Sequence, residues 1–299
     1  MFKHETQVKK FLLKWYYVNA RILPWRKKTN KTLVNPYFVF VSEYMLQQTT
    51  VPTVINKFNQ FVTIWPKIEN LASSNEQKIL NFWSGLGYYS RAKNLLKSAK
   101  EIQKNYKGIV PNKYKELINL PGIGDYTAKA ILGIAYNKPV MPIEANIERI
   151  ISRIYAFQEP KNKIKNKLID KSILFVSKQS STKLIQAFMD YGSLVCTPRN
   201  PKCDICSINH HCLSFKKKIQ HKIPVKIMKQ KKKPKKYTRA YVLLNENNEI
   251  LVRTRSPKGM LASMLEVPND LWVEKKSLLQ NDKVVKILNS NFDSKGSII

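Results

Sequence analysis

The sequence predicts a mainly α-helical protein that ends in a short α/β or β segment, and three observations lead to this prediction. From Val8 to Ser214, apolar residues recur at helical spacing, and clusters of Pro, Gly and Asn separate the apolar blocks. A lysine-rich stretch, 216–236, then interrupts this pattern. Beyond that stretch, apolar and polar residues alternate as they do in β-strands.

Helical spacing is clearest in a few blocks, and turn-forming residues lie between them. We expect helices within Val8–Tyr17, Thr53–Phe61, Lys78–Phe82, Ala92–Ile102 and Lys167–Ser177. Helix-breaking pairs and triplets occur at Asn35-Pro36, Gly85–Gly87, Pro111-Asn112 and Pro121–Gly124. Residues 1–215 are therefore expected to form one helical domain with short connections.

The C-terminal part of the chain is expected to be a separate, small domain. Residues 216–236 contain 11 Lys in 21 positions and no acidic residue, which indicates a linker that can also contact phosphate. Strands are expected at Thr238–Leu244 and Glu249–Thr254, joined by a turn at Asn245–Asn248. Residues 237–299 alone are few for an independent core.

The formal net charge of +33 favours a polyanionic partner, with DNA or RNA first. Lysine dominates this excess and is abundant along with Asn and Ile, as in proteins from AT-rich genomes, so part of the charge carries no function. No run of about 18 apolar residues occurs, and the N-terminus lacks the features of a secretion signal. We therefore expect a protein of the reducing cytoplasm, associated with the nucleoid, without a membrane span.

All four cysteines of the chain lie close together in the sequence. Cys196, Cys203, Cys206 and Cys212 have the spacing C-x6-C-x2-C-x5-C. Four thiolates within so short a segment can surround one metal centre, and the chemistry of the ligands allows either zinc or an iron–sulfur cluster.

Residues 120–128 read L-P-G-I-G-D-Y-T-A, which is typical of a tight turn leading into a helix. The glycines Gly122 and Gly124 allow the backbone to approach a phosphate closely, and a helix N-terminus offers free N–H donors. The alternative is a simple corner between two helices without a ligand. We favour the phosphate-binding interpretation.

These features together resemble the MutY-type adenine DNA glycosylases of the helix–hairpin–helix/endonuclease III superfamily. The cysteine spacing resembles that family's 4Fe–4S loop, the string at 120–128 its hairpin, and the string S-E-Y-M-L-Q-Q-T at 42–49 is close to diagnostic for it. The resemblance covers about residues 8–215, and residues 237–268 more weakly. It implies a two-lobed helical fold with a 4Fe–4S cluster in the loop 196–212, and a truncated Nudix-like domain at 237–299.

The resemblance also implies a reaction, the hydrolysis of the N-glycosidic bond of adenine mispaired with 8-oxoguanine or guanine in double-stranded DNA, by a monomeric enzyme. Such a reaction needs an acid for the leaving base and a negative group for the cationic sugar. Glu43, in the string at 42–49, corresponds to the family's general acid and base. Glu144 occupies the position of the family's cation-stabilising Asp.

Two of these positions bear on the strength and type of catalysis. The extra methylene of Glu144 displaces its carboxylate by roughly an ångström, whereas active sites hold such groups within about 0.5 Å. We therefore expect lower activity than a Glu144→Asp variant would have. Tyr126 stands where bifunctional relatives carry a Lys, and because Tyr cannot form an imine, the resemblance implies a monofunctional glycosylase.

Other residues are assigned to the site by position in the resembling motifs. The adenine pocket is expected to include Trp25, Arg26, Leu46, Val51 and Asp190, and contacts with the distorted DNA are expected from Gln48, Thr49, Leu86 and Tyr88. Two alternatives stay open: an endonuclease III-like glycosylase with lyase activity, and a decayed mismatch-binding protein with little catalysis.

Overall fold

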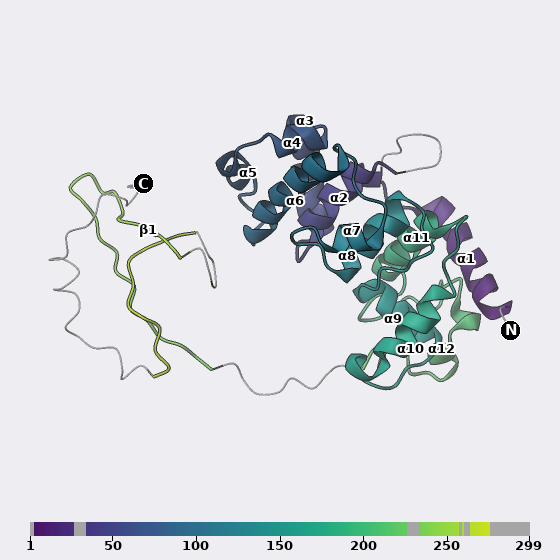
Figure 1. The fold of residues 1–299 in the computed structure, drawn as a ribbon. Helices are drawn as coiled ribbons and strands as arrows, with labels where there is room; N and C mark the ends of the chain where they lie inside the picture. The colour runs from purple at the N-terminus through teal and green to yellow at the C-terminus, as the bar shows by residue number, and fades with distance from the viewer. Residues whose placement is uncertain (1–2, 27–33, 226–233, 257–258, 260–263, 276–299) are drawn as a thin grey trace. The chain divides into compact units, whose positions relative to one another are not determined.

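The computed structural model describes residues 3–26, 34–225, 234–256, 259 and 264–275. The chain divides into two compact units, Met1–Ile227 and Met228–Ile299. The first unit is almost entirely helical, and the second contains short strands (Figure 1). The mainly helical fold predicted from the sequence is confirmed.

The helices of the first unit gather in two lobes (Figure 1). One lobe contains α2 (Pro36–Leu46), α3 (Val51–Ile64), α4 (Ile68–Ala72), α5 (Glu76–Phe82), α6 (Ser90–Tyr106), α7 (Tyr114–Ile118) and α8 (Asp125–Ala130). The other contains α1 (Lys3–Asn19), α9 (Ala145–Ile154), α10 (Lys161–Ile173), α11 (Ser181–Leu194) and α12 (Leu213–Lys216).

The described residues of this unit also include three one-turn segments: η1 (Pro24–Arg26), η2 (Ile131–Ala135) and η3 (Asn209–His211). The segment η2 continues α8 with wider π-helical turns and is buried throughout. Because η2 packs against both α2 and α11, it joins the two lobes.

Helix α2 forms the centre of the first lobe. Asn35 caps it, accepting from the backbone N–H of Tyr37 at 2.9 Å, and Pro36 occupies the first helical position, where its missing N–H costs nothing. The helix is buried over most of its length, so its position is fixed on several sides. Its last turns carry Glu43, which is only 6% exposed.

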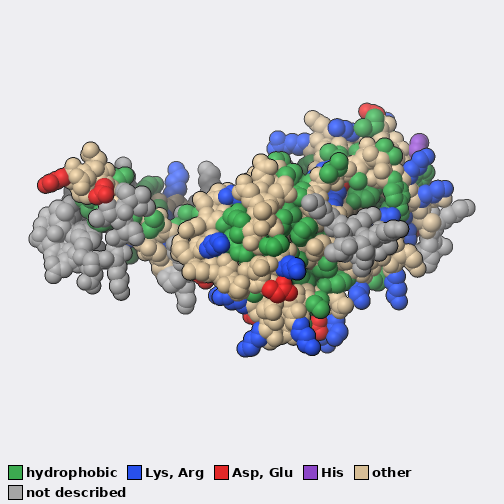
Figure 2. All heavy atoms as spheres, turned by 90° about the horizontal axis from the view of Figure 1, so that it is seen from above, with side chains coloured by type: hydrophobic (Ala, Val, Ile, Leu, Met, Phe, Trp, Pro, Cys, Tyr) green, Lys and Arg blue, Asp and Glu red, His purple; other side chains and the backbone are tan. Residues whose placement is uncertain are grey.

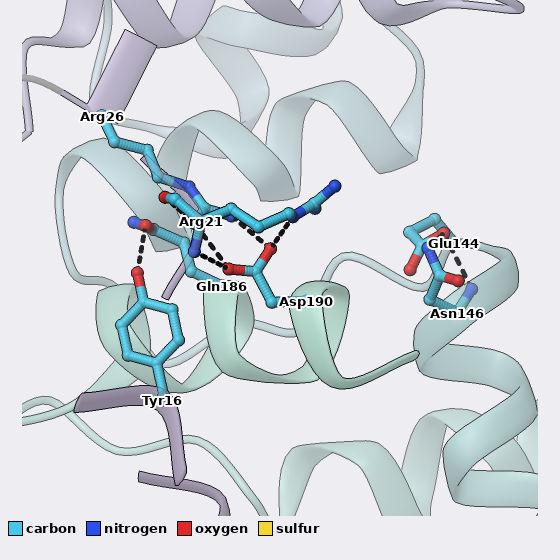
Figure 3. A network of polar contacts seen from close by, with 7 residues as sticks. All are labelled: Tyr16, Arg21, Arg26, Glu144, Asn146, Gln186 and Asp190. Atoms are coloured by element: carbon cyan, nitrogen blue, oxygen red, sulfur yellow. Dashed lines mark hydrogen bonds and ion pairs between the residues drawn. The ribbon is translucent and has the colours of Figure 1, made fainter. Parts of the chain in front are cut away.

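Helix α11 crosses closely over the start of α9. A Cβ atom at Gly192 would lie 2.5 Å from the Cβ of Asn146, a distance that real structures do not tolerate. Glycine at this position therefore allows α11 to approach the N-terminus of α9, which brings Asp190 and Glu144 to neighbouring parts of one site (Figure 3).

The expected helices are present, with some shifted bounds. The block expected at Lys167–Ser177 is the second half of α10, which already ends at Ile173. The helical unit also continues beyond residue 215, because Ile223 is buried and its carbonyl accepts from Arg153 at 2.9 Å. The first residues of the expected linker are thus part of the helical unit.

The second unit shows less strand than the alternation predicted. Strand β1 (Arg253–Thr254) pairs antiparallel with β2 (Leu265–Glu266), with Arg253 opposite Glu266. Isolated bridges join Ala240 to Asn269 and Leu244 to Ile250. The rest of the expected Nudix-like segment, including 260–263 and 276–299, lies outside the described residues.

In the part of the chain that the structure describes, no helix is both long and apolar enough to cross a membrane.

Candidate active site

A cavity of about 270 Å³ lies between the two lobes, and most of the residues predicted for catalysis and base binding surround it. Its walls come from η1, α2, the start of α3, α8, η2, the start of α9 and α11. The predicted residues that line it are Trp25, Arg26, Glu43, Leu46, Val51, Tyr126 and Glu144. The structure thus brings together residues that are far apart in the sequence.

Glu43 is the most perturbed acid in the cavity. Burial raises the pKa of its carboxyl group to about 8, with a further increase from the nearby Glu144, although a hydrogen bond with Tyr126 acts in the opposite direction. The carboxyl group therefore carries its proton at neutral pH. Burial and both carboxylates raise the pKa of Tyr126 well above its ordinary value, so its hydroxyl stays neutral and can donate to Glu43.

Glu144 caps helix α9. Its Oε1 accepts from the backbone N–H of Ile147 at 2.9 Å, and its Oε2 accepts from the backbone N–H of Asn146 at 2.8 Å and from the Asn146 side chain at 3.1 Å. Burial raises the pKa of Glu144 overall, and these bonds and the charge of Arg149 oppose this increase without cancelling it. The two acids thus differ in environment: Glu144 is held by several N–H donors, whereas Glu43 is buried beside the hydroxyl of Tyr126.

Asp190 is fully buried and lies in a network with two arginines (Figure 3). Its Oδ1 accepts from Arg21 Nε at 2.6 Å and Arg26 Nη2 at 2.8 Å. Its Oδ2 accepts from the Arg21 backbone at 3.0 Å and Arg26 Nη1 at 2.7 Å. Burial alone would raise the pKa of Asp190, but the arginines outweigh it and lower the pKa.

This network changes the interpretation of Asp190. A carboxylate has about four lone-pair sites, and the two arginines use all of them. Asp190 does not line the cavity, whereas Arg21 and Arg26 do. A direct contact with a base, as expected from the sequence, is therefore not what this arrangement favours; Asp190 instead fixes the two arginines in the cavity wall.

The residues expected to contact the distorted DNA or its phosphates lie on three neighbouring turns. Gln48 and Tyr88 both have positive φ, 58° and 49°, and the side chain of Tyr88 is 62% exposed. Thr49 Oγ1 lies 3.5 Å from the carbonyl of Leu86, whose own side chain is buried. The turns around Gln48 and Tyr88 are therefore adjacent.

The third turn is the hairpin before α8. Gly122 has φ +79°, and a Cβ there would lie 2.9 Å from Asn94 and 3.0 Å from Tyr44, so both conformation and space require glycine. Gly124 precedes α8 and has open space around it. The side chain of Gln47 donates to the carbonyl of Gly122 at 3.3 Å, which places this hairpin beside the turn at Gln48.

The four cysteines line a single cavity in the second lobe, and none is in a disulfide. Arg153 donates to Cys196 Sγ at 3.2 Å, and the Tyr191 hydroxyl donates to Cys206 Sγ at 3.2 Å. Among the described residues, no three His, Cys, Asp or Glu converge as they would on one metal ion. Sulfurs that surround a cavity and receive hydrogen bonds fit a cluster of several atoms.

Sequence reasoning missed several polar residues that complete the site. Arg149 donates to the side chain of Asn146 at 2.7 Å and to the carbonyl of Cys196 at 2.7 Å, so contacts run from Glu144 to the cysteine loop. Burial and partners such as these have no signal in a single sequence. The others missed were Arg21, Arg91, Arg153 and Gln186.

The geometry agrees with what comparison with known proteins finds. Residues 41–172 match the family of HhH-GPD superfamily base excision DNA repair proteins, and residues 196–212 match the iron–sulfur binding domain of endonuclease III. An adenine DNA glycosylase of Buchnera aphidicola subsp. Baizongia pistaciae is 38% identical over 286 residues, which is 92% of this chain and 78% of that protein. The chain belongs to the adenine DNA glycosylase family.

Solved structures show the same fold. A thermostable thymine-DNA glycosylase matches with a TM-score of 0.65 and 25% identity, over 72% of this chain and 98% of that one. An endonuclease III from a non-covalent DNA complex matches with a TM-score of 0.58 and 18% identity over the same shares, which shows the fold alone. As a member of this family, the protein is a base-excision-repair glycosylase, and its four cysteines are the ligand set of a 4Fe–4S cluster.

Proposed function

We propose that this protein removes adenine mispaired with 8-oxoguanine or guanine in double-stranded DNA, as a monomer, by hydrolysis of the N-glycosidic bond. The observation that carries the proposal is the position of Glu43 in the cavity, where burial raises the pKa of its carboxyl group to about 8 and so favours the protonated form at neutral pH. A protonated acid close to a second carboxyl group in a different environment is the arrangement that glycosidic bond cleavage uses.

In the proposed reaction, Glu43 gives its proton to N7 of the flipped adenine as the bond between N9 and C1′ breaks. Adenine leaves as a neutral base, and the carboxylate of Glu144 stabilises the positive charge left on the sugar. Glu43, now a carboxylate, accepts a proton from the water that adds to C1′ and thereby returns to its acid form. Tyr126 donates to Glu43 and orients it.

The size and walls of the cavity support a single base as its occupant. Its volume is near the lower end for ligand sites, which run from roughly 300 Å³ upward. Apolar walls from Trp25, Leu46 and Val51 suit the faces of a flat ring, and the guanidinium groups of Arg21 and Arg26 offer donors at its edge. Because a base can reach this cavity only outside the helix stack, the reaction requires base flipping.

The charge of the protein suits a DNA partner. Lysine and arginine side chains are spread over the helical unit in Figure 2 and are far more frequent there than acidic ones. We propose that the hairpin at Gly122 and Gly124 and the basic residues of the cysteine loop contact phosphates, while Gln48 and Tyr88 contact the distorted base pair. The cluster would stiffen that loop and take no part in the chemistry.

Lyase activity is not part of the proposal. Tyr126 has no amine, and Lys129, one turn further along, is paired with Asp125 at 2.8 Å. Borohydride treatment during the reaction is therefore expected to trap no covalent adduct. Efficient trapping would instead favour the endonuclease III-like alternative.

The test uses purified protein with its cluster and duplexes that contain A:8-oxoguanine, A:G or T:G, with alkali to reveal abasic sites. We expect cleavage at adenine in the first two duplexes, and a loss of about 100-fold or more in Glu43→Gln. The rate should fall tenfold per pH unit above about 8, because the proton on Glu43 is lost. Glu159→Gln, an exposed carboxylate, is the control.

Three results would contradict parts of this proposal. Wild-type rates in Glu43→Gln would remove Glu43 from catalysis. Cleavage at T:G alone would point to the activity named for the thymine-DNA glycosylase structure. Tight binding to A:8-oxoguanine without base release, at high enzyme concentration, would support the mismatch-binding alternative.

A further inference from the structure

Arg91 lies at the start of α6, is only 6% exposed and contacts no carboxylate among the ion pairs of the described residues. Its guanidinium group instead donates to five backbone carbonyls from two separate segments. Three belong to the C-terminal end of α2 and two to the turn at 85–88: Tyr44 (3.2 Å), Met45 (2.8 Å), Gln47, Leu86 (2.6 Å) and Gly87 (2.9 Å).

Three of these carbonyls have one further side-chain partner: Gly87 accepts from Trp83 Nε1 at 3.1 Å, and the carbonyls of Gln47 and Leu86 each lie 3.5 Å from Thr49 Oγ1. The last carbonyls of a helix lack N–H donors within it and carry the negative end of the helix dipole. Arg91 therefore caps α2 from a different helix, and with the same group it holds the turn at 85–88 against α2. The guanidinium also lies 5.5 Å from the ring of Trp83 and 5.6 Å from that of Tyr88.

The two segments that Arg91 joins contain the two exposed turns proposed to meet the distorted base pair. Gln48 directly follows Gln47, and Tyr88 directly follows Gly87, so each residue is attached to a carbonyl that Arg91 binds. Both have positive φ, which is unfavourable for residues with a Cβ and persists only where the surroundings impose it. Glu43 lies on the same end of α2.

We infer that Arg91 is a positioning residue that fixes Gln48, Tyr88 and the catalytic end of α2 in one geometry, so that flipping of the base and its capture in the cavity occur together. The inference rests on the proposed function. Arg91 itself is buried and does not line the cavity. Its effect on the reaction passes through the backbone of the two turns.

Lysine cannot replace arginine in this position. The planar guanidinium holds its N–H groups in a fixed fork, so Nη1 serves the carbonyls of α2 while Nη2 serves those of the turn, whereas an ammonium group has three donors around one point. Arg91→Lys keeps the positive charge near the end of α2, so it separates the geometry of the fork from the charge.

The experiment compares the wild type, Arg91→Lys and Lys97→Met. Lys97 is an exposed residue of the same helix, so Lys97→Met controls for changes on α6. Each protein, loaded with its cluster, is tested for helix content, affinity for an undamaged duplex, adenine release under single turnover, and the fluorescence increase when 2-aminopurine opposite guanine leaves the stack.

We expect Arg91→Lys to keep its helix content and to bind undamaged duplex within about threefold of wild type. Its 2-aminopurine signal should be largely lost and its adenine release should fall by about 10- to 100-fold, because small displacements of a site cost rates of that order. Lys97→Met should keep both signals. This pattern separates positioning from general stability.

Several outcomes would overturn the inference. Adenine release and 2-aminopurine fluorescence equal to wild type in Arg91→Lys would do so, as would equal losses in Lys97→Met. Loss of helix content in Arg91→Lys would assign Arg91 to the stability of the whole unit instead. A wild-type protein that increases 2-aminopurine fluorescence but releases no adenine would refute the proposed function, while the fluorescence comparison still decides on Arg91.

Discussion

Replacement of Glu43 by Gln should make this protein more stable while it removes the proposed acid. Burial raises the pKa of Glu43 from the ordinary 4.5 to about 8, so the folded protein holds a proton that the unfolded chain releases. A group with a raised pKa in the folded state contributes its full stability below the unfolded pKa and loses it as pH rises towards the folded pKa. The neutral amide of the Glu43→Gln variant would have no such dependence.

The expected size follows from the two pKa values. Each pH unit inside the window from 4.5 to about 8 changes the free energy of unfolding by up to about 1.4 kcal/mol. Between about pH 5 and about pH 7, the advantage of the Gln variant should therefore grow by about 2.5 kcal/mol. For a unit of this size, that corresponds to a difference in melting temperature that grows by about 5–10 °C.

The assay is thermal unfolding of both proteins, followed by far-UV circular dichroism across this pH range, with Glu159→Gln as the matched control. Other titrating groups affect wild type and variant alike, so they largely cancel in the difference between the two. The reasoning is refuted if the difference in melting temperature between the two proteins is independent of pH. It is also refuted if the Gln variant becomes less stable relative to wild type as the pH rises. The exposed control should show no comparable trend.

Three further predictions concern neighbouring parts of the site. Glu144→Asp should release adenine faster than wild type in single-turnover assays, by roughly tenfold, because the shorter side chain corrects the displaced carboxylate; an equal or slower rate would contradict this. Tyr126→Lys should form a covalent DNA adduct that borohydride traps, since it places an amine beside Glu43, and absence of the adduct would show that the amine does not reach the sugar. Arg153→Met should lower the iron content and the visible absorbance of the purified protein, because it leaves the buried carbonyl of Ile223, two partly buried carbonyls and a cysteine sulfur without their donor. Loss of the donor to the buried carbonyl alone costs about 1–3 kcal/mol. The exposed Arg199→Met should keep its iron, and equal iron in both variants would refute the role of Arg153.

The local parts of this fold could be predicted from the sequence, and the contacts between distant segments could not. Apolar spacing identified the helices, and the tight turn at 120–128 could be predicted because turn formation at glycines is a local property; Gly122 indeed has positive φ. The positive φ of Gln48 and Tyr88 had no such signal. Their conformations depend on Arg91 and on the turns packed around them.

Glu144 and Asp190 are two further residues whose hydrogen-bond partners could not be predicted from the sequence. Glu is not among the residues preferred as helix caps, yet the side chain of Glu144 places both oxygens on free N–H groups in the first turn of α9. Asp190 was assigned by position in a motif, but its partners Arg21 and Arg26 come from a segment more than 160 residues away. Such pairings decide which oxygen is free for a ligand, and only the fold determines them.

Arginine and lysine have different places in this basic protein. By count, the chain has nine Arg against 44 Lys, so lysine is the default cation. Arginine nevertheless occupies the buried junctions where one group must serve several acceptors. Arg91 binds five carbonyls, Arg153 binds three carbonyls and a cysteine sulfur, Arg149 binds three carbonyls and an amide, and Arg26 pairs both nitrogens with Asp190.

A lysine at any of these positions would leave acceptors without donors inside the protein, which costs more than the charge alone. Lysine can therefore replace other residues on the solvent-facing surface at little cost in stability. At these buried positions, replacement of arginine by lysine would destabilise the fold. It follows that much of the lysine excess adds a diffuse attraction to DNA. The few arginines, by contrast, hold the turns, the cavity wall and the cysteine loop in the arrangement on which the chemistry depends.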